Sequence, residues 1–404
     1  MAAKDLPADE KEFMTLSQDE MEEMKTTFEA GNLEAVAKKL QEKLEMLDKI
    51  QIHIAVTGEA GSGKSTFVNA IRGLGDEDAG AAKTGEVETT VQPEPYPHPT
   101  LPNVTLWDLP RIGTPKFKAD EYLEQVSSQK YDFFIILTAN QFTTHHTQLA
   151  QEIQKMKKRF YYVRSQVDFG LQAEQKSRPS IYNEEGILQK IRNDCIENLR
   201  RGAGEPSPRV FLISSWELTK YDFHLLQQAL EDDLDVEKRH AFILALPNIS
   251  AQILEKKKAA FKREIWMLAL LSGAISAVPV PGLSIIADIQ ILEVNMRRYC
   301  QAFGLDDTAL LRLAQRVGKP VAELKSVIKA VPTASSINKE FVIRMLARPA
   351  CLGVMIAEEL LDLVPVAGPL LSGGVSFGST FYMLKRFLND AAEDAHRVLQ
   401  KALS

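Results

Sequence analysis

The chain has 404 residues, of which 45% are hydrophobic and 25% are charged, and these values are typical of a globular protein with about two domains. The net charge of −6 at pH 7 indicates no general attraction to nucleic acid, so we expect no nucleic-acid partner and only local basic surfaces. The three cysteines are far apart without a C-x-x-C pair, which argues against a disulfide framework or a zinc site and favours the cytoplasm.

The N-terminal segment, residues 1–50, is predicted to be helical. Glu, Lys, Leu and Met recur here at helical spacing, and Gly31 with Asn32 divides the pattern into two helices. The charged start of the chain does not fit a signal peptide, and Ala2 stands where N-myristoylation requires glycine. We therefore expect no lipid anchor at this end.

The next segment, residues 51–240, is predicted to form an α/β domain. Short apolar runs alternate here with helical patterns, which is typical of a mostly parallel, doubly wound sheet flanked by helices. The β-like runs lie at residues 52–56, 104–107, 133–137, 160–163 and 210–213.

The strongest chemical signal is GEAGSGKS at residues 58–65, which fits the P-loop pattern G-x-x-x-x-G-K-[ST] at every fixed position. A β-like run precedes it and a helical pattern follows, so its backbone N–H groups can hold phosphate oxygens at a helix N-terminus. We expect Lys64 to contact the β- and γ-phosphates and the Ser65 hydroxyl to bind Mg²⁺. The predicted phosphate-binding residues are Gly58, Glu59, Ala60, Gly61, Ser62, Gly63, Lys64, Ser65 and Thr66.

A second phosphate-sensing turn is predicted in WDLPRIGT at residues 107–114, built around Asp108. Such a turn normally has glycine three residues after the aspartate, because the backbone there approaches a phosphate, yet this chain has Arg111. The guanidinium could contact the phosphates or point to solvent with Gly113 acting as hinge, or switching could be impaired. We expect nucleotide binding to survive this replacement more easily than switching.

The base-binding loop is predicted in RSQVD at residues 164–168. GTPases usually select guanine with an Asn/Thr-Lys-x-Asp loop, whose aspartate accepts hydrogen bonds from guanine N1 and N2. Asp168 stands at the aspartate position, but Gln166 replaces the lysine, so we expect weaker guanine affinity. Ser214 and Ser215, after the last β-like run, either close the base pocket or are ordinary turn residues.

Two adjacent histidines, His145 and His146, follow the third β-like run. Adjacent positions cannot both point along one helix face as metal ligands at i and i+4 would. We therefore interpret them as solvated loop residues.

The last segment, residues 241–404, is predicted to be helical, with a connection near Pro247, and we expect it to pack with the N-terminal segment as one all-α domain. Residues 265–287 and 363–384 carry no charge, but VPVPG and VPVAG interrupt them. We favour buried helical hairpins, with a membrane-contacting surface and true membrane spans as alternatives. A basic stretch leads into the first uncharged run and could dock on anionic lipid or simply enter a protein core. Its lysines are Lys256, Lys257, Lys258 and Lys262.

Several segments together resemble the immunity-related GTPases, the interferon-inducible GTPases of the dynamin-like superfamily. They are GEAGSGKSTFVNAIRG, AAKTGEVETTVQPEPYPHP, WDLPRIGT, YDFFIIL, FYYVRSQVD and LPNIS, and the resemblance covers essentially the whole chain. It implies GTP binding and hydrolysis to GDP, with G-domain dimers or oligomers forming in the GTP state. It also implies peripheral association with endomembranes or pathogen vacuoles in innate defence.

The resemblance also implies roles for particular residues. Thr90 matches the threonine that serves Mg²⁺ and the γ-phosphate, and Asp108 would contact Mg²⁺ through water. Glu88 matches the glutamate that supports hydrolysis across a GTP-bound dimer. Because Ile112 stands where a water-orienting glutamine would follow the turn, Glu88 gains importance.

Two alternative functions remain open at this point. A pseudo-GTPase scaffold would bind guanine nucleotide with little turnover, and the replacements at Arg111 and Gln166 motivate it. A membrane-embedded P-loop protein would use the two uncharged stretches as spans.

Overall fold

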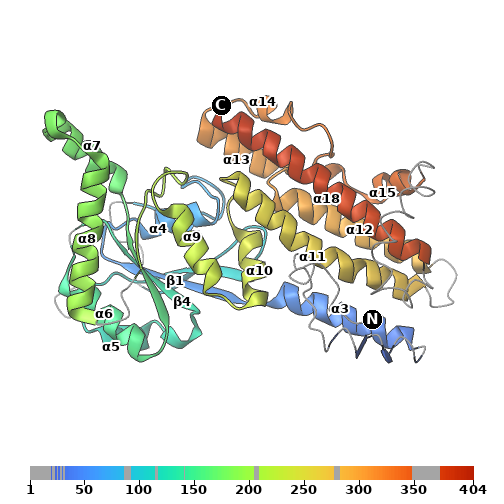
Figure 1. Cartoon of the computed structure of the whole chain (residues 1–404), viewed down its shortest axis with the longest axis horizontal. Coiled ribbons are helices and arrows are strands. Elements are labelled where there is room, and N and C mark those ends of the chain that lie inside the picture. The colour runs from blue at the N-terminus through green and yellow to red at the C-terminus, as the bar shows by residue number, and fades with distance from the viewer. Residues whose placement is uncertain are drawn as a thin grey trace. The chain divides into compact units, whose positions relative to one another are not determined.

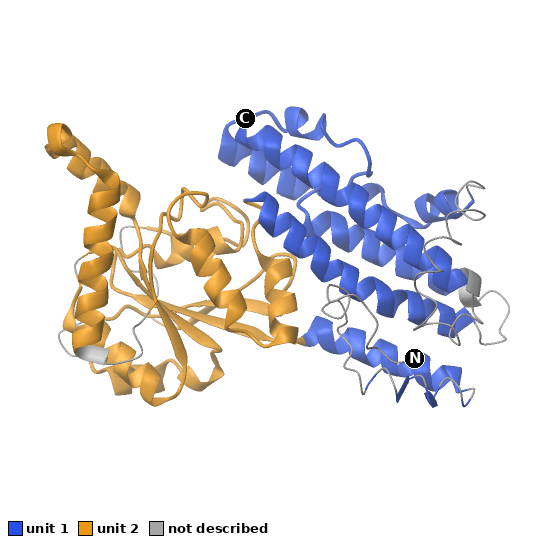
Figure 2. Cartoon of the chain, in the orientation of Figure 1, with its two compact units in different colours: residues 1–49, 250–404 blue, residues 50–249 orange. Residues whose placement is uncertain are grey.

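The computed structural model of the chain (Figure 1) describes residues 20, 23–24, 26–27, 30, 32–85, 92–113, 117–140, 142–203, 209–276, 283–347 and 374–404. Two compact units divide the chain (Figure 2): residues 50–249 form one, and residues 1–49 with 250–404 form the other. The division falls beside Pro247 rather than at residue 240. It does so because helix α10 (Val236–Ala245) packs on α9 (Phe223–Asp232) and on the sheet of residues 50–249.

The unit of residues 50–249 is built on a six-stranded sheet in the order β2-β3-β1-β4-β5-β6. Every neighbouring pair is parallel except β2 with β3, which confirms the predicted mostly parallel sheet. The strands are β1 (Ile52–Gly58), β2 (Glu94–Pro97), β3 (Val104–Asp108), β4 (Phe133–Thr138), β5 (Arg159–Arg164) and β6 (Val210–Leu212).

Strand β2 is absent from the sequence prediction. It contains Pro95 and Pro97 and pairs with β3 alone, at the edge of the sheet. Proline has no N–H to donate to a strand ladder, so it is confined to edges, and a run containing two prolines does not resemble a strand in sequence.

Helices cover both faces of this sheet, which explains why β1 and β4 are buried along almost their whole length rather than at alternate positions. One face packs against α5 (Ala119–Gln125), α6 (Thr144–Lys155) and α8 (Glu184–Ala203). Helices α4 (Lys64–Ile71), α9 and α10 contact β1, β3 and β6. Helix α7 (Val167–Ser177) leads from β5 toward α8.

The unit of residues 1–49 and 250–404 is helical where it is described and joins the two ends of the chain, as the sequence predicted. Helix α11 (Ala251–Ser276) packs against α3 (Leu33–Lys49), α12 (Leu283–Ala302) and α18 (Gly374–Leu403). Helix α3 begins after Asn32, whose Oδ1 accepts the N–H of Ala35 at 3.2 Å. The shorter elements are α13 (Asp307–Val317), α14 (Val321–Lys325) and α15 (Lys339–Leu346).

A charged contact ties the N-terminal helix to this bundle. Arg298 on α12 lies 2.6 Å from Glu264 on α11 and 3.4 Å from Asp48 on α3. Glu264 is almost fully buried, and the nearby Arg298 guanidinium offsets the cost of burying its charge.

The basic stretch on α11 is partly internal, which corrects one of its predicted roles. Lys257 is 3% exposed and donates to the Ala302 carbonyl at 2.8 Å, at the C-terminus of α12. Burial lowers the pKa of Lys257 to about 7. Lys257 therefore cannot take part in lipid docking, because its ammonium caps a neighbouring helix inside the bundle.

The first uncharged stretch is mostly buried along α11, whereas Ile285 and Ile286 near the start of α12 are 63% and 66% exposed. Residues 265–276 continue α11 and pack against α18, where Trp266 contacts the rings of Phe377 and Phe381. Residues 277–282 and 348–373 lie outside the described part of the chain. None of the helices described is both long and apolar enough to cross a membrane.

Candidate nucleotide site

The P-loop connects the end of β1 to the start of α4, as its sequence predicts. Gly58, Gly61 and Gly63 have φ values of 155°, 73° and 82°, which residues other than glycine rarely adopt. A Cβ added to Gly58 would lie 2.0 Å from the Leu137 carbonyl oxygen on β4. The loop can therefore turn closely over the sheet and present backbone N–H groups at the N-terminus of α4.

Lys64 is the first residue of α4 and reaches back over the loop. Its ammonium donates to the carbonyls of Gly58 at 3.4 Å and Glu59 at 3.1 Å. These contacts hold the charge beside the loop amides, so both kinds of donor are available to one phosphate group.

Ser65 and Asp108 meet beside the P-loop. The Ser65 hydroxyl donates to Asp108 Oδ2 at 2.6 Å, and the aspartate is 1% exposed. The register of β1 with β3 pairs Val56 with Asp108, which brings the end of β3 next to the loop. A hydroxyl beside a carboxylate supplies the hard oxygen ligands that Mg²⁺ prefers, so these two residues fit the predicted ion.

The turn after β3 is fastened to β1 at several points. The N–H of Leu109 donates to Val56 at 2.9 Å, and the N–H of Ile112 donates to Gly58 at 3.1 Å. Arg111 is exposed and is not among the residues with positive φ, whereas Gly113 has φ of 89°. The left-handed conformation that needs glycine therefore lies at Gly113, and Arg111 causes no backbone strain.

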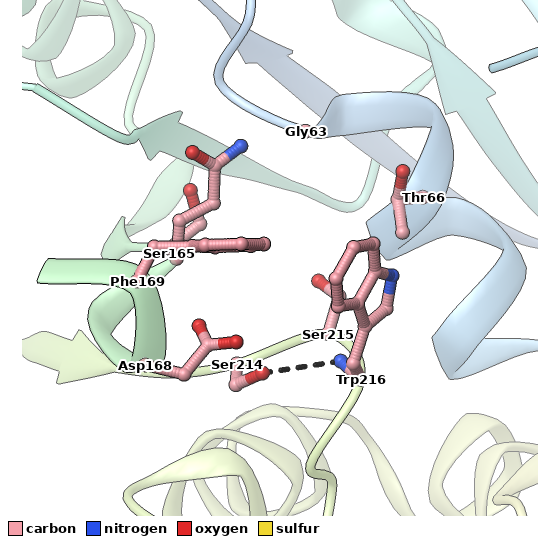
Figure 3. A pocket seen from close by; sticks show the side chains of 9 residues that line it. Gly63, Thr66, Ser165, Asp168, Phe169, Ser214, Ser215 and Trp216 are labelled. Atoms are coloured by element: carbon pink, nitrogen blue, oxygen red, sulfur yellow. Dashed lines mark hydrogen bonds between the residues drawn. The ribbon is translucent and has the colours of Figure 1, made fainter. Parts of the chain in front are cut away.

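The predicted base-binding residues gather in one pocket (Figure 3), between the end of β5, the end of β6 and the start of α4. Asp168 lies in the first turn of α7 and is 8% exposed. Its Oδ1 is buried and has no hydrogen-bond partner among the described residues. The pocket is lined by Gly63, Thr66, Ser165, Gln166, Asp168, Phe169, Ser214, Ser215 and Trp216.

Gln166 uses its side chain to bridge the two halves of the site. It has φ of 55° at the N-cap of α7, and its Nε2 donates to the Gly61 carbonyl at 3.1 Å. The amide is therefore bound to the P-loop in this structure.

Sequence reasoning missed Ser165, Phe169 and Trp216. The Ser165 hydroxyl donates to the Ser62 carbonyl at 2.7 Å and lies 3.1 Å from the Thr138 carbonyl, so it ties the base loop to the P-loop and β4. Its place just before Gln166 in RSQVD could have identified it. The two aromatic residues directly follow Asp168 and Ser215 in sequence. Their role in the pocket becomes evident only from the contact between their rings in the structure.

The predicted solvated loop histidines are instead part of α6, which is a correction. His146 is fully buried and forms a capping box with Thr143, whose N–H donates to Nδ1 at 3.1 Å. Thr143 also donates to Glu59 Oε1 at 3.1 Å, and His146 Nε2 lies 3.7 Å from the same oxygen. Burial, with the charges of His145 and Arg164, lowers the pKa of His146 to about 4. Thr143 at the start of α6 thus helps to hold the P-loop by donating to the Glu59 carboxylate.

Two predicted catalytic residues cannot be placed. Glu88 and Thr90 lie outside the described residues, between Gly85 and Gln92.

The family model described as "Interferon-inducible GTPase (IIGP)" matches residues 17–402 of the chain. "Interferon-inducible GTPase 5" of Bos taurus is 44% identical over 406 residues, covering 100% of this chain and 87% of the relative. "Interferon-inducible GTPase 1" of Mus musculus is 35% identical over 386 residues, covering 96% and 91%. Among solved structures, Toc33 from Arabidopsis thaliana in complex with Mg²⁺ and GMPPNP is 15% identical. It covers 44% of this chain and 77% of that one, with a TM-score of 0.32.

Proposed function

The chain belongs to the interferon-inducible GTPase family, and we propose that it binds GTP and hydrolyses it to GDP and phosphate. One observation carries this proposal: the P-loop and the buried carboxylate of Asp168 line the same pocket, which Gly63 and Thr66 share. A nucleotide needs a phosphate cradle and a base reader within one molecule's length, and this pocket provides both.

The residues of the chain have distinct parts in this proposal. The loop amides and the Lys64 ammonium bind the β- and γ-phosphate oxygens, and the Ser165 contact keeps the base loop aligned with the P-loop. Ser65 and Thr90 would hold Mg²⁺ directly and Asp108 would hold it through water. When bound, the ion neutralises charge that develops on the phosphate oxygens.

Hydrolysis requires a group that orients the attacking water, and the turn after β3 offers none in the usual place. Ile112 is 2% exposed and apolar, and the guanidinium of Arg111 has no hydrogen-bond acceptor for a water. We therefore assign this role to Glu88 of a second copy, as the family resemblance implies. Turnover then depends on a GTP-bound dimer of G domains.

A second candidate function is a scaffold that binds guanine nucleotide with little turnover. Arg111 replaces a glycine of the phosphate-sensing turn, and the Gln166 amide donates to the P-loop carbonyl of Gly61. Both changes leave the P-loop intact. They should therefore impair the conformational response to GTP more than they weaken nucleotide binding.

We further propose that the helical unit mediates peripheral contact with intracellular membranes or pathogen vacuoles in innate defence. Lys258 and Lys262 on α11 lie near Lys385 on α18, and burial with the charges of both neighbours lowers the pKa of Lys262. A clustered set of ammonium groups can attract anionic lipid.

Liposome binding tests this contact when Lys256, Lys258 and Lys262 are replaced by glutamate while the buried Lys257 is kept. Loss of sedimentation with phosphatidylserine vesicles supports the contact. Unchanged sedimentation would remove it.

The GTPase proposal is tested by phosphate release measured across a range of protein concentrations. We expect turnover per molecule to rise with concentration, Lys64→Ala to abolish it, and Arg111→Gly to accelerate it. Binding of GTP without turnover at any concentration would favour the scaffold instead.

A further inference from the structure

Two large aromatic side chains lie exposed at the mouth of the base pocket. Phe169 is 47% exposed and Trp216 is 65% exposed. Their rings meet edge to face, with centroids 5.2 Å apart and planes at 67°. Figure 3 shows the rings on either side of the space above Asp168 and Ser214. Exposed apolar side chains gathered at a pocket typically mark a ligand contact.

The two rings differ in how firmly they are held. Phe169 lies in the first turn of α7, directly after Asp168, so the helix fixes its position relative to the carboxylate. Trp216 follows β6 in a loop, where its backbone N–H donates to Ser214 Oγ at 3.2 Å. The backbone of Trp216 is therefore anchored, while most of its indole is in contact with solvent.

The usual cover of the base is missing from this pocket. The stem of a lysine normally lies over the base at the position of Gln166, but the Gln166 amide is bound to the Gly61 carbonyl at 3.1 Å. A side chain held against the P-loop offers little apolar surface to a ring, so another residue has to provide it.

We propose that Phe169 and Trp216 stack on the two faces of the guanine ring and replace the missing lysine stem. This inference rests on the proposed function and assigns the affinity determinants of the same pocket. A ring between two aromatic faces requires about 7 Å, twice the usual carbon contact distance of roughly 3.5 Å. At 5.2 Å and 67° the pair is closed, so Trp216, the exposed partner on the loop, swings outward and turns parallel to Phe169 when a base enters.

Stacking and hydrogen bonding then have different roles in recognition of the base. Aromatic stacking tolerates any base, because every base has a π-face. The buried Asp168 carboxylate reads only a base with two adjacent donors, as guanine has. The aromatic pair therefore sets affinity for purine nucleotides, and Asp168 sets the preference among them.

The test compares binding of GDP, ADP and inorganic tripolyphosphate to the full chain and its variants. Phe169→Ala and Trp216→Ala should weaken GDP and ADP by a similar factor, about tenfold or more, and leave tripolyphosphate unchanged. Unchanged tripolyphosphate binding also shows that the P-loop is intact. Trp216→Phe should retain most of the GDP affinity, and Ile181→Ala, which removes an exposed apolar side chain outside the pocket, should retain all of it.

Tryptophan fluorescence tests the movement. GDP should change the emission of the wild type and of the double variant Trp107→Phe/Trp266→Phe, in which Trp216 is the remaining tryptophan. Alanine variants that bind GDP like the wild type would overturn the stack alone, and so would a Trp216→Phe variant as weak as Trp216→Ala. A wild type that binds no guanine nucleotide would overturn the proposed function and the stack with it.

Discussion

The phosphate half and the base half of the proposed nucleotide site are built in different ways. The phosphate half consists of backbone, with Gly58, Gly61 and Gly63 in conformations that glycine favours. The base half consists of side chains, among them Asp168 and Phe169, on elements that meet only after folding. A site made of backbone admits almost no replacement, whereas a site made of side chains can exchange one contact for another. The departures from the GTPase pattern in the base loop accordingly leave a complete pocket.

The largest effect is expected where the backbone leaves no room. Gly58→Ala places a Cβ 2.0 Å from a backbone oxygen of β4, so β1 or the loop must shift. We expect GDP binding to fall by more than about hundredfold and the protein to lose stability. Calorimetric titration and thermal unfolding measure both.

A matched control for this change is Gly170→Ala in α7, where an added Cβ meets nothing within 4 Å. It should keep GDP affinity and gain up to about 1 kcal/mol of stability, because alanine favours helix over glycine. Equal behaviour of the two variants would contradict the close approach at Gly58.

Removing the base reader should have the next largest effect. Asp168→Ala deletes a buried acceptor, and losing charge-assisted hydrogen bonds should weaken GDP binding by roughly tenfold to a hundredfold. ADP binding should hardly change, so the preference for guanine should disappear. A preference that survives in competition titrations would show that another group reads the base.

The support of the phosphate half by α6 predicts a pH dependence. His146 has a pKa of about 4 in the folded chain and about 6.5 when unfolded, because burial disfavours its charged form. Between these values the unfolded chain binds the additional proton, so stability falls as pH falls from 6.5 toward 4. One pH unit below 6.5, this group should cost about 1.4 kcal/mol.

His146→Gln removes that titration while keeping an acceptor for the Thr143 N–H. Urea unfolding at pH 7 and pH 5.5 should show a smaller loss of stability in the variant than in the wild type. An equal loss in both proteins would mean that His146 does not titrate as its burial requires.

The smallest effect is expected from restoring the usual lysine. Gln166→Lys gives up the bond to the Gly61 carbonyl but adds a charge and an apolar stem over the base. We expect GDP to bind a few-fold more tightly, as a partly exposed cation–π contact would provide. No gain in affinity would indicate that the aromatic pair already covers the base fully.

The sequence was sufficient for features that depend on local spacing. The five parallel strands, the P-loop and the helical character of both chain ends follow from short-range patterns, and the structure has them. Features that depend on packing were missed or wrong. The edge strand β2 contains two prolines, and His146 and Lys257 are polar residues whose burial arises from elements distant in sequence.

The Phe169–Trp216 contact shows the same limit within the site itself. Each ring is adjacent to a predicted site residue, but Phe169 lies in α7 after β5 and Trp216 lies in the loop after β6. The residue pattern within a single segment does not predict that β5 and β6 are neighbouring strands. The base half could therefore be located from sequence through Asp168, but its aromatic walls could not.

The central claim is that an intact phosphate cradle and an altered base pocket together form a guanine-nucleotide site. Competition of a fluorescent GDP analogue against GTP and ATP tests it most directly, with the wild-type chain and Mg²⁺ present. We predict displacement by GTP at concentrations well below those needed for ATP. Displacement by ATP at equal or lower concentrations would contradict the assignment.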